Sequence, residues 1–153
     1  MERIQSFCVD HDYINEGIYI SRIDGDITTF DMRTRRPNCG DYMDNITMHS
    51  LEHMFATYIR NSDIGGSVIY FGPMGCRTGF YLLTRDIAPE RVLLEVCLAL
   101  EKIAAHEGGV FGATRKECGN YLELDIEAAR REAKRYLGVL KSNKNDFVYP
   151  QGE

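Results

Sequence analysis

Residues 49–53 read HSLEH, in which two histidines lie four positions apart and a glutamate precedes the second. On an α-helix, which turns by about 100° per residue, His49, Glu52 and His53 fall within an arc of about 100°. Two imidazoles at positions i and i+4 can bind one divalent ion from successive turns, and a neighbouring carboxylate can exchange protons with a ligand of that ion. The motif therefore predicts a metal site, with a solvated helix face that binds nothing as the alternative.

A metal site of this kind needs at least a third protein ligand, and a catalytic site also keeps one position open. Two of the five cysteines lie in loops that suit chemistry. Cys118 precedes Gly119 before the last expected helix, where a thiolate can turn toward a metal, with a buried structural thiol as the alternative. Cys76 lies in PMGCRTG, where the glycines admit a substrate closely and Arg77 favours the thiolate. An incidental cysteine in a glycine-rich hairpin is the alternative for Cys76.

The remaining cysteines and His106 fit simpler roles. Cys97 lies in an apolar helical stripe and is expected to be a small buried thiol. His106 is expected in the last turn of the same helix, where its charge would complement the helix dipole. Cys8 and Cys39 have no distinctive neighbours. Five irregularly spaced cysteines are more typical of free thiols in a reducing compartment than of a disulfide framework.

Two hairpins and three helices are expected to position these residues. Segments rich in β-branched and aromatic residues predict paired strands, 17–23 with 27–32 and 67–71 with 80–84. Apolar residues at helical spacing predict helices at about 45–61, from 89 to just before Gly108, and from 126 onward. Leu51, Met54 and Phe55 form the core face of the first helix, away from the HSLEH trio. The pattern predicts an α+β fold with helices packed on one face of an antiparallel sheet of about four strands.

Length and charge narrow the class of protein. The 153 residues, 44% of them hydrophobic, suit one compact domain over 1–153, with about 142–153 as a C-terminal tail. The net charge of -5 and the lack of blocks of like charge argue against binding to nucleic acid or to an anionic membrane. No run of roughly 18 apolar residues occurs, and the start MERIQSFCVDHD has no apolar region, so we expect a cytoplasmic protein without a membrane span.

Three motifs occur along the chain in a distinctive order and spacing: HSLEH at 49–53, GPMGCRTGFYLL at 72–83 and ECGN at 117–120. Together they resemble the S-ribosylhomocysteine lyases, the LuxS family. The resemblance covers most of the chain, because it also includes an SFxxDH-like stretch from Ser6 to His11, the sequence FDMR ending at Arg33, and Pro37-Asn38.

The resemblance implies a role for each of these side chains. The metal ligands would be His49, His53 and Cys118. The metal in that family is usually Fe(II), often replaced by zinc or cobalt in the isolated protein. Cys76 and Glu52 would be the acid/base pair of the reaction.

The resemblance also implies a homodimer with two active sites at the subunit interface. Arg33 would favour the thiolate of Cys76 and hold the substrate. Ser6 and His11 would contact substrate from the neighbouring subunit. Arg60 matches a family arginine near the homocysteine end of the substrate.

In that family, the ribose of S-ribosylhomocysteine opens to the aldehyde, and its carbonyl moves from carbon one to carbon three by two enediolate-mediated proton shifts. Homocysteine then leaves from carbon five by β-elimination. The other product, 4,5-dihydroxy-2,3-pentanedione, is the precursor of autoinducer-2. No redox cofactor is consumed, but a Lewis-acid ion must hold successive oxygens while bases act on both sides of the sugar chain.

The sequence departs from the family pattern at one position, and two other functions for the HSLEH motif stay open. Tyr70 stands six residues before Cys76, where many family members have an acid that helps to hold the homocysteine moiety. HxxEH is also the signature of inverzincin metallopeptidases, for which Glu127 or Glu132 could be the distant zinc ligand. A non-catalytic, metal-stabilised binding module would instead have a closed set of ligands.

Overall fold

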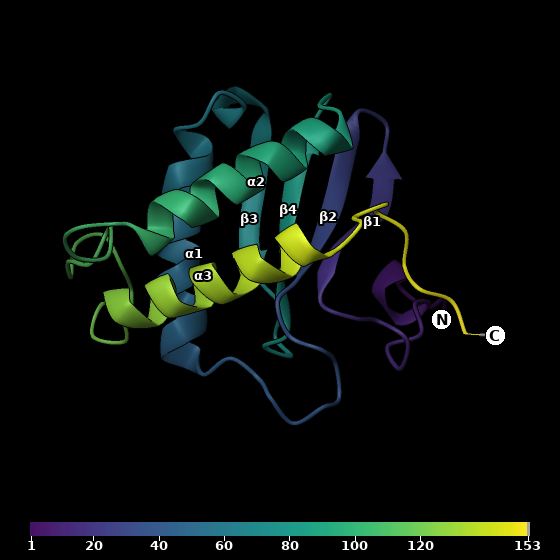
Figure 1. Ribbon diagram of the computed structural model, residues 1–153, viewed down its shortest axis with the longest axis horizontal. Helices are drawn as coiled ribbons and strands as arrows, with labels where there is room; N and C mark the ends of the chain where they lie inside the picture. Colours follow the sequence, from purple (N-terminus) through teal and green to yellow (C-terminus); the bar gives the residue numbers. More distant parts are fainter. Residues whose placement is uncertain (153) are drawn as a thin grey trace.

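Four strands and three helices form an α+β fold in the computed structural model, which describes residues 1–152. The strands β1 (Gly17–Asp24), β2 (Ile27–Arg33), β3 (Val68–Pro73) and β4 (Gly79–Arg85) make one antiparallel sheet in the order β1-β2-β4-β3. The helices are α1 (Asn45–Arg60), α2 (Pro89–Ala104) and α3 (Ile126–Ser142), and short 3₁₀ turns lie at Gln5–Phe7 and Gly65–Ser67. The helices lie against one face of the sheet (Figure 1), so the expected arrangement of elements is confirmed.

Local sequence signals explain where several elements begin and turn. Gly25, with a φ of 62°, allows the tight turn between β1 and β2. Asp44 and Asp125 precede α1 and α3, and each carboxylate accepts a hydrogen bond from a backbone N–H of the first turn. Pro89 opens α2, where its missing N–H costs no helical hydrogen bond. Within the described residues, no helix combines the length and apolar character needed to cross a lipid bilayer.

The loop after α2 differs from the expectation for His106. The helix ends at Ala104, so His106 lies beyond its last turn. Its Nδ1 atom lies 2.7 Å from the Tyr58 hydroxyl, and its Nε2 atom lies 3.1 Å from the Gly109 carbonyl oxygen. Because both ring nitrogens have these partners, His106 attaches the loop to α1 instead of complementing the dipole of α2.

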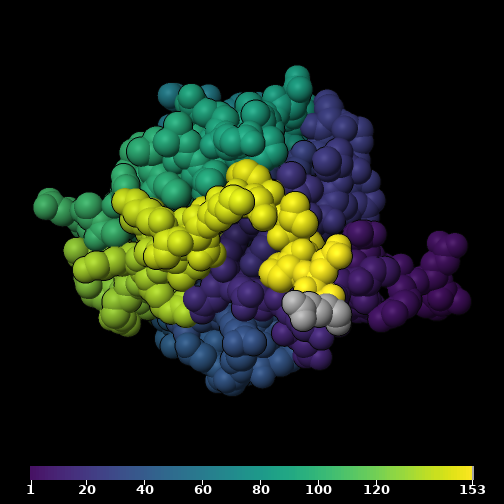
Figure 2. All heavy atoms as spheres, turned by 45° about the vertical axis from the view of Figure 1, so that its right-hand side comes forward, coloured from purple at the N-terminus to yellow at the C-terminus, as the bar shows by residue number. Residues whose placement is uncertain are grey.

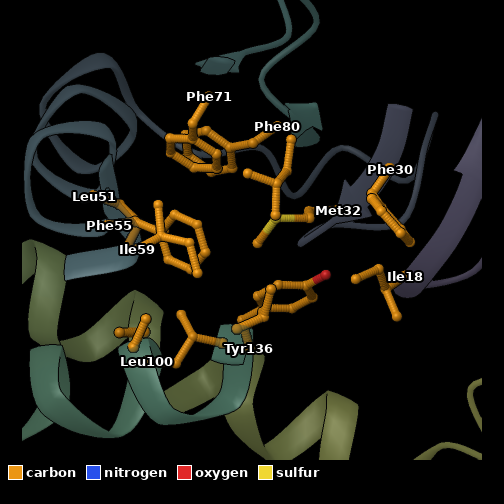
Figure 3. Close-up of a cluster of buried hydrophobic side chains, with 14 of the residues drawn as sticks. Ile18, Phe30, Met32, Leu51, Phe55, Ile59, Phe71, Phe80, Leu100 and Tyr136 are labelled. Atoms are coloured by element: carbon orange, nitrogen blue, oxygen red, sulfur yellow. The ribbon is translucent and has the colours of Figure 1, made fainter. Parts of the chain in front are cut away.

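The core lies between the sheet and the three helices (Figure 3). Its largest buried side chains include Phe30, Met32, Phe80 and Leu82 from the central strands and Leu51, Phe55, Leu100 and Tyr136 from the helices. Burying each such side chain contributes about 1.5–3 kcal/mol to the free energy of folding. The packing holds the apolar side of α1 against the sheet, which leaves the HSLEH histidines on the other side of the helix.

The opposite face of the sheet is covered in part by the two ends of the chain. Asp31 and Arg33 alternate with the core residues of β2, and both are buried on this face. The Tyr149 hydroxyl donates to Asp31 at 2.7 Å, and the Tyr149 ring stacks on Tyr19 with the centroids 4.8 Å apart. The segment that follows α3 therefore returns to β1 and lies near the N-terminal residues (Figure 2).

Candidate metal centre and active site

Two histidines from α1 and one cysteine from the loop between α2 and α3 form a group of possible metal ligands. The ligand atoms of His49, His53 and Cys118 all lie within 4.8 Å of one another, and Cys118 Sγ is 3.4 Å from His49 Nε2. The two imidazole rings are nearly perpendicular, at 85°, with their centroids 4.7 Å apart. Within residues 1–152, no other His, Cys, Asp and Glu side chains form such a group. The fold thus brings together the three donors that the sequence singles out.

Backbone carbonyl groups of the α2–α3 loop fix the orientation of both imidazoles. His49 Nδ1 lies 3.0 Å from the carbonyl oxygen of Glu123, and His53 Nδ1 lies 2.8 Å from that of Phe111. Because a carbonyl oxygen can only accept, each Nδ1 carries the proton and donates it. Each Nε2 then keeps its lone pair for a metal, an arrangement typical of metal-binding histidines. No motif predicts these contacts, because every residue carries a carbonyl group.

The donor set fits a divalent transition metal. In a tetrahedral site with bonds of about 2.0 Å to nitrogen and about 2.3 Å to one sulfur, the donors lie roughly 3.3–3.5 Å apart. The distance of 3.4 Å between Cys118 Sγ and His49 Nε2 lies in that range, and all three donor atoms lie within 4.8 Å of one another. Imidazole and thiolate suit iron and zinc among the common protein metals. Three protein donors leave a fourth position open, as catalytic sites require, whereas a structural site has four protein ligands.

Glu52 lies on the same side of α1 as the two histidines but outside the donor group. Its side chain is half-buried, one position before His53. Among the described residues, its carboxylate has neither a hydrogen-bond donor nor an ion-pair partner. A carboxylate without competing partners can accept and return a proton, which is the property required of a general base.

Cys76 is exposed in the β3–β4 loop and is linked to Arg33 through a third residue. Its Sγ atom lies 3.1 Å from the Thr78 hydroxyl oxygen, which also accepts a 2.7 Å hydrogen bond from Arg33 Nη1. Arg33 is held by Asp31, through Nε at 3.0 Å and Nη2 at 2.5 Å. Burial opposes the charge of Arg33, but the Asp31 carboxylate outweighs it and raises the pKa of the guanidinium. A permanent positive charge is therefore placed near Cys76.

Arg77, which the sequence suggests as the cation beside Cys76, has other partners. Its Nη1 atom donates to the Met43 carbonyl oxygen at 3.4 Å, and its guanidinium lies 6.0 Å from the centre of the Tyr42 ring. Its backbone has a φ of 62°, an unusual value for a residue with a side chain. Arg77 is therefore engaged with Met43 and Tyr42, whereas Arg33 is linked to Cys76 by hydrogen bonds through the Thr78 hydroxyl.

The two N-terminal candidates lie beside Arg33 of the same chain. Ser6 and His11 line a small cavity on the outer face of the sheet together with Asp31, Arg33 and Tyr81. His11 Nδ1 bonds to the Val9 carbonyl oxygen at 2.9 Å, which leaves Nε2 for another partner. This group is separate from the three donors, since neither side chain belongs to the His49 group.

Tyr70 belongs to β3, one edge strand of the sheet, and Arg60 at the end of α1 contacts the start of the same strand. Arg60 is exposed at the end of α1, and its guanidinium donates to the carbonyl oxygens of Val68 and Ile69 at 3.3 Å and 3.1 Å. Tyr70 is 51% exposed and lines a cleft of about 400 Å³ that also contains Ser6. The position that departs from the family pattern thus shares a cleft with a candidate substrate contact.

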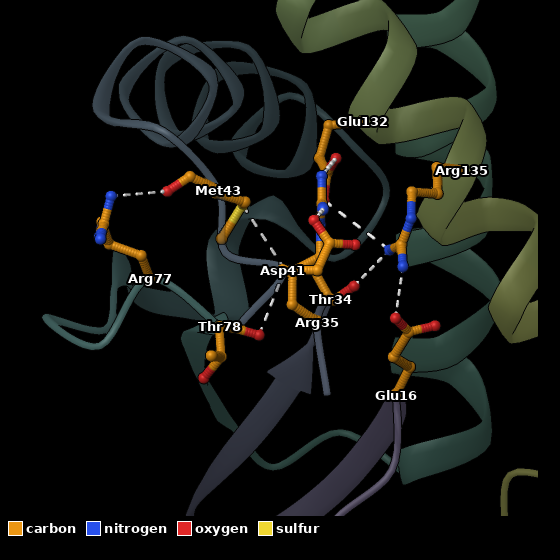
Figure 4. A network of polar contacts seen from close by, with 9 residues as sticks. All are labelled: Glu16, Thr34, Arg35, Asp41, Met43, Arg77, Thr78, Glu132 and Arg135. Atoms are coloured by element: carbon orange, nitrogen blue, oxygen red, sulfur yellow. Dashed lines mark hydrogen bonds and ion pairs between the residues drawn. The ribbon is translucent and has the colours of Figure 1, made fainter. Parts of the chain in front are cut away.

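The two acids considered as distant zinc ligands are engaged elsewhere. Glu132 is buried and accepts from Arg35 through both carboxylate oxygens, at 2.9 Å and 2.6 Å (Figure 4). Glu127 pairs with Arg130 at 3.0 Å. Neither carboxylate joins the histidines of HSLEH. The metallopeptidase ligand set is therefore not formed, and the third donor is a sulfur.

Comparison with known sequences identifies the family of the chain. A family model described as S-ribosylhomocysteinase (LuxS) matches residues 4–146. The chain belongs to the LuxS family. It is 40% identical to the S-ribosylhomocysteine lyase of Clostridium beijerinckii over 158 residues, covering 98% of this chain and 99% of that protein. It is also 40% identical to the enzyme of the same name from Finegoldia magna over 157 residues, covering 99% and 100%. The resemblance carried by the three motifs is thus confirmed, and the metallopeptidase alternative is not supported.

In this LuxS-family chain, the substitution Gly112→Ala is expected to weaken metal binding by about 10- to 100-fold. Gly112 follows Phe111, has a φ of 66°, and a Cβ atom there would lie 3.3 Å from His53 Nδ1. The methyl group would strain the loop and displace the carbonyl that orients His53. Competition against a metal-chelating dye measures the affinity. Gly109→Ala in the same loop, where an added Cβ has open space, is the control, and equal affinities for the two variants would contradict the expectation.

Proposed function

We propose that this chain is a metal-dependent lyase that cleaves S-ribosylhomocysteine to homocysteine and 4,5-dihydroxy-2,3-pentanedione, the precursor of autoinducer-2. The observation that carries the proposal is the group of two imidazoles and one cysteine sulfur, whose three donor atoms lie within 4.8 Å of one another. The LuxS family match over residues 4–146 supports the same substrate.

The reaction consists of proton transfers followed by one elimination. The carbonyl of the opened ribose moves from carbon one to carbon three, because each shift removes a proton from the carbon next to a carbonyl and returns one to the former carbonyl carbon. A proton then leaves carbon four while the sulfur of homocysteine leaves carbon five with the bonding electrons and takes up a proton. The resulting enol gains a proton at carbon five and loses its hydroxyl proton, which gives the dione. The two products contain all the atoms of the substrate, so the reaction consumes no oxidant or reductant.

His49, His53 and Cys118 are the residues that we propose as metal ligands. The bound ion would polarise the substrate oxygens as a Lewis acid, which makes the neighbouring C–H protons removable. We propose Fe(II) as the ion, with zinc or cobalt as substitutes, because imidazole and thiolate donors suit such metals. Metal analysis of protein purified without oxygen identifies the ion.

Cys76 and Glu52 are the proposed acid/base groups. A thiolate and a carboxylate on different elements can act on opposite sides of the sugar chain, as the successive proton shifts require. Arg33 would favour the thiolate and bind substrate oxygens, and Arg60 would interact with the homocysteine end. Tyr70 cannot supply the charge of the acid found in many relatives, so recognition of that end would depend more on other contacts.

We also propose a homodimer with its active sites at the subunit interface. The outer face of the sheet carries apolar side chains that a monomer leaves exposed, including Ile4 at 58%, Phe7 at 63% and Tyr70 at 51%. Ile4 and Tyr70 line the same cleft, and clustered exposed apolar side chains of this kind are typical of an interface. Ser6 and His11 lie on this face, whereas the proposed metal donors lie on α1 and in the α2–α3 loop, so we propose that the site takes Ser6 and His11 from the partner chain.

Mixing two inactive variants tests the shared site. His53→Ala removes a metal donor and His11→Ala removes the proposed contact from the partner, so each homodimer is expected to have little activity. A mixed dimer would contain one intact site, and random subunit exchange would restore about a quarter of the wild-type rate. No recovery after exchange, checked by mass spectrometry of the intact dimers, would place His11 in the site of its own chain.

A cytoplasmic location is the remaining part of the proposal. All five cysteines are free thiols, which suits a reducing compartment. The function itself is tested by incubating the purified protein with S-ribosylhomocysteine and measuring free thiol with a chromogenic disulfide. We expect thiol release that stops when Cys76 is alkylated. Thiol release by the metal-free protein at the same rate would argue against the metal-dependent reaction.

A further inference from the structure

The hydroxyl group of Thr78 lies between the guanidinium of Arg33 and the thiol of Cys76. Its oxygen is 2.7 Å from Arg33 Nη1 and 3.1 Å from Cys76 Sγ. We propose that Thr78 is a positioning residue, whose hydroxyl transmits the positive charge of Arg33 to Cys76 and holds the thiolate in place for proton transfer. The proposal rests on the lyase function proposed above, and it assigns the link between the cation and the reactive sulfur to one side chain.

The direction of the two hydrogen bonds follows from the groups involved. A guanidinium can only donate, so the Thr78 oxygen accepts from Arg33. The hydroxyl then has one proton, and Cys76 Sγ is its partner within the described residues. A thiolate can only accept, so the ionised sulfur completes a continuous run from Arg33 through Thr78 to Cys76. Hydrogen bonds that involve ionised groups are stronger than neutral ones, and successive bonds polarise one another.

The backbone of Thr78 is held firmly enough to act as a fixed support. Its carbonyl oxygen accepts from Thr34 N at 3.0 Å, from Arg35 N at 2.9 Å and from the Thr34 hydroxyl at 3.3 Å. Arg35 is in turn bound by Glu132 of α3 and by Asp41 (Figure 4). The residue is only 2% exposed. Because the Thr78 side chain is buried on a fixed backbone, it loses little conformational entropy when its hydroxyl bonds to Cys76. The hydroxyl can therefore hold the sulfur in one position.

The other end of the hydrogen-bond run is also fixed. Asp31 accepts from Arg33 through both carboxylate oxygens and from the Tyr149 hydroxyl. Arg33 thus presents Nη1 to Thr78 while its Nε and Nη2 donate to Asp31. Since Asp31 is nearer to Arg33 than Cys76 is, the hydroxyl of Thr78 is needed to extend the effect of the cation to the sulfur.

Three other groups near Cys76 bear on its ionisation. Tyr81 of β4 faces it, and burial, with a further contribution from Asp31, raises the pKa of that phenol, so Tyr81 stays neutral near pH 7. Asp31 of β2 is held in an ion pair with Arg33, on the side of the guanidinium that does not contact Thr78. Arg77 in the same loop is directed to Met43 and Tyr42. Arg33 is therefore the charge that Thr78 couples to Cys76.

The test compares Thr78→Val with Thr78→Ser in the metal-loaded protein. Alkylation of Cys76 by iodoacetamide is followed against pH and read from the Cys76 peptide by mass spectrometry, because Cys8 and Cys39 are also exposed. Loss of the hydroxyl in Thr78→Val is expected to move the alkylation profile up by about one pH unit, which slows alkylation about tenfold near neutral pH. Thr78→Ser keeps the hydroxyl and is expected to stay within about twofold of the wild type.

Thr84→Val is the matched control for the change of a buried threonine. Thr84 lies in β4, the strand that directly follows Thr78. It is fully buried, and its hydroxyl has no hydrogen-bond partner among the described residues. Its alkylation profile and lyase rate are expected to equal those of the wild type. Thr78→Ala is measured in parallel, since it cannot overfill the site if Thr78→Val fails to fold.

Lyase kinetics give a second readout of the same link. Thr78→Val is expected to lower kcat about tenfold or more with a smaller change in KM, and Thr78→Ser is expected to restore kcat. An unchanged alkylation profile in folded Thr78→Val or Thr78→Ala, or a Thr78→Ser profile as displaced as that of Thr78→Val, would overturn the proposal. Absence of lyase activity in the wild type would instead overturn the proposed function, because the alkylation profiles are measured without substrate.

Discussion

Cys76→Ala is expected to keep the fold and the metal of the wild type and to lower lyase turnover by about 10²- to 10⁴-fold, the usual contribution of a positioned proton-transfer group. The loss is expected to be larger if the thiol acts in several of the proposed proton shifts. Cys76 is exposed at the β3–β4 loop, outside the core and outside the metal-donor group, so its removal should leave both intact. Metal content, the circular dichroism spectrum and the rate of homocysteine release are compared for the variant and the wild type.

Cys39→Ala is the control for this substitution, because Cys39 is also an exposed free thiol but lies outside the proposed site. It should release homocysteine at the wild-type rate. If Cys76→Ala also released homocysteine at close to that rate, the thiol would not be the acid/base group, and the division of proton transfers between Cys76 and Glu52 would be wrong.

The substitutions His53→Ala and Cys118→Ala are expected to abolish stable metal binding and, with it, turnover. A three-donor site cannot lose one donor without losing most of its affinity, because each remaining bond is too weak to hold the ion alone. Glu52→Gln, one position before His53, should keep the metal and lose turnover, because the amide preserves shape but cannot exchange protons. Elemental analysis after dialysis against a weak chelator separates the two outcomes.

Cys97→Ala is the control for the loss of a thiol from the chain. Cys97 is half-buried in α2, where burial raises its pKa, and it has no place in the donor group. It should retain one metal ion per chain. A full metal complement in Cys118→Ala would remove Cys118 from the ligand set.

Most of the fold follows from local patterns in the sequence. The four expected strands and three expected helices are present, and the first helix, expected at about 45–61, spans 45–60. Short-range signals determine these elements: the turn at Gly25, the N-caps at Asp44 and Asp125, and helical apolar stripes. The end of α2 was less predictable, because the bonds of His106 to Tyr58 and Gly109 depend on a neighbouring helix.

The candidate site is predictable only in its residue types. HSLEH places two imidazoles on one side of a helix, and that local geometry is present. Phe111 and Glu123 lie far from the histidines in the sequence, and no sequence motif marks a backbone carbonyl group. The hydrogen bonds that orient His49 and His53 could therefore not be predicted. Thr78 could not be assigned either, because its role requires β2 and the β3–β4 loop to meet.

Product stoichiometry tests the lyase function most directly. The Fe(II)-loaded protein is incubated with S-ribosylhomocysteine in the absence of any redox cofactor, and both products are quantified by mass spectrometry, the pentanedione after trapping with an aromatic diamine. We predict equal amounts of homocysteine and 4,5-dihydroxy-2,3-pentanedione, formed together over time. Release of neither product by folded protein with one metal ion per chain would contradict the proposed function.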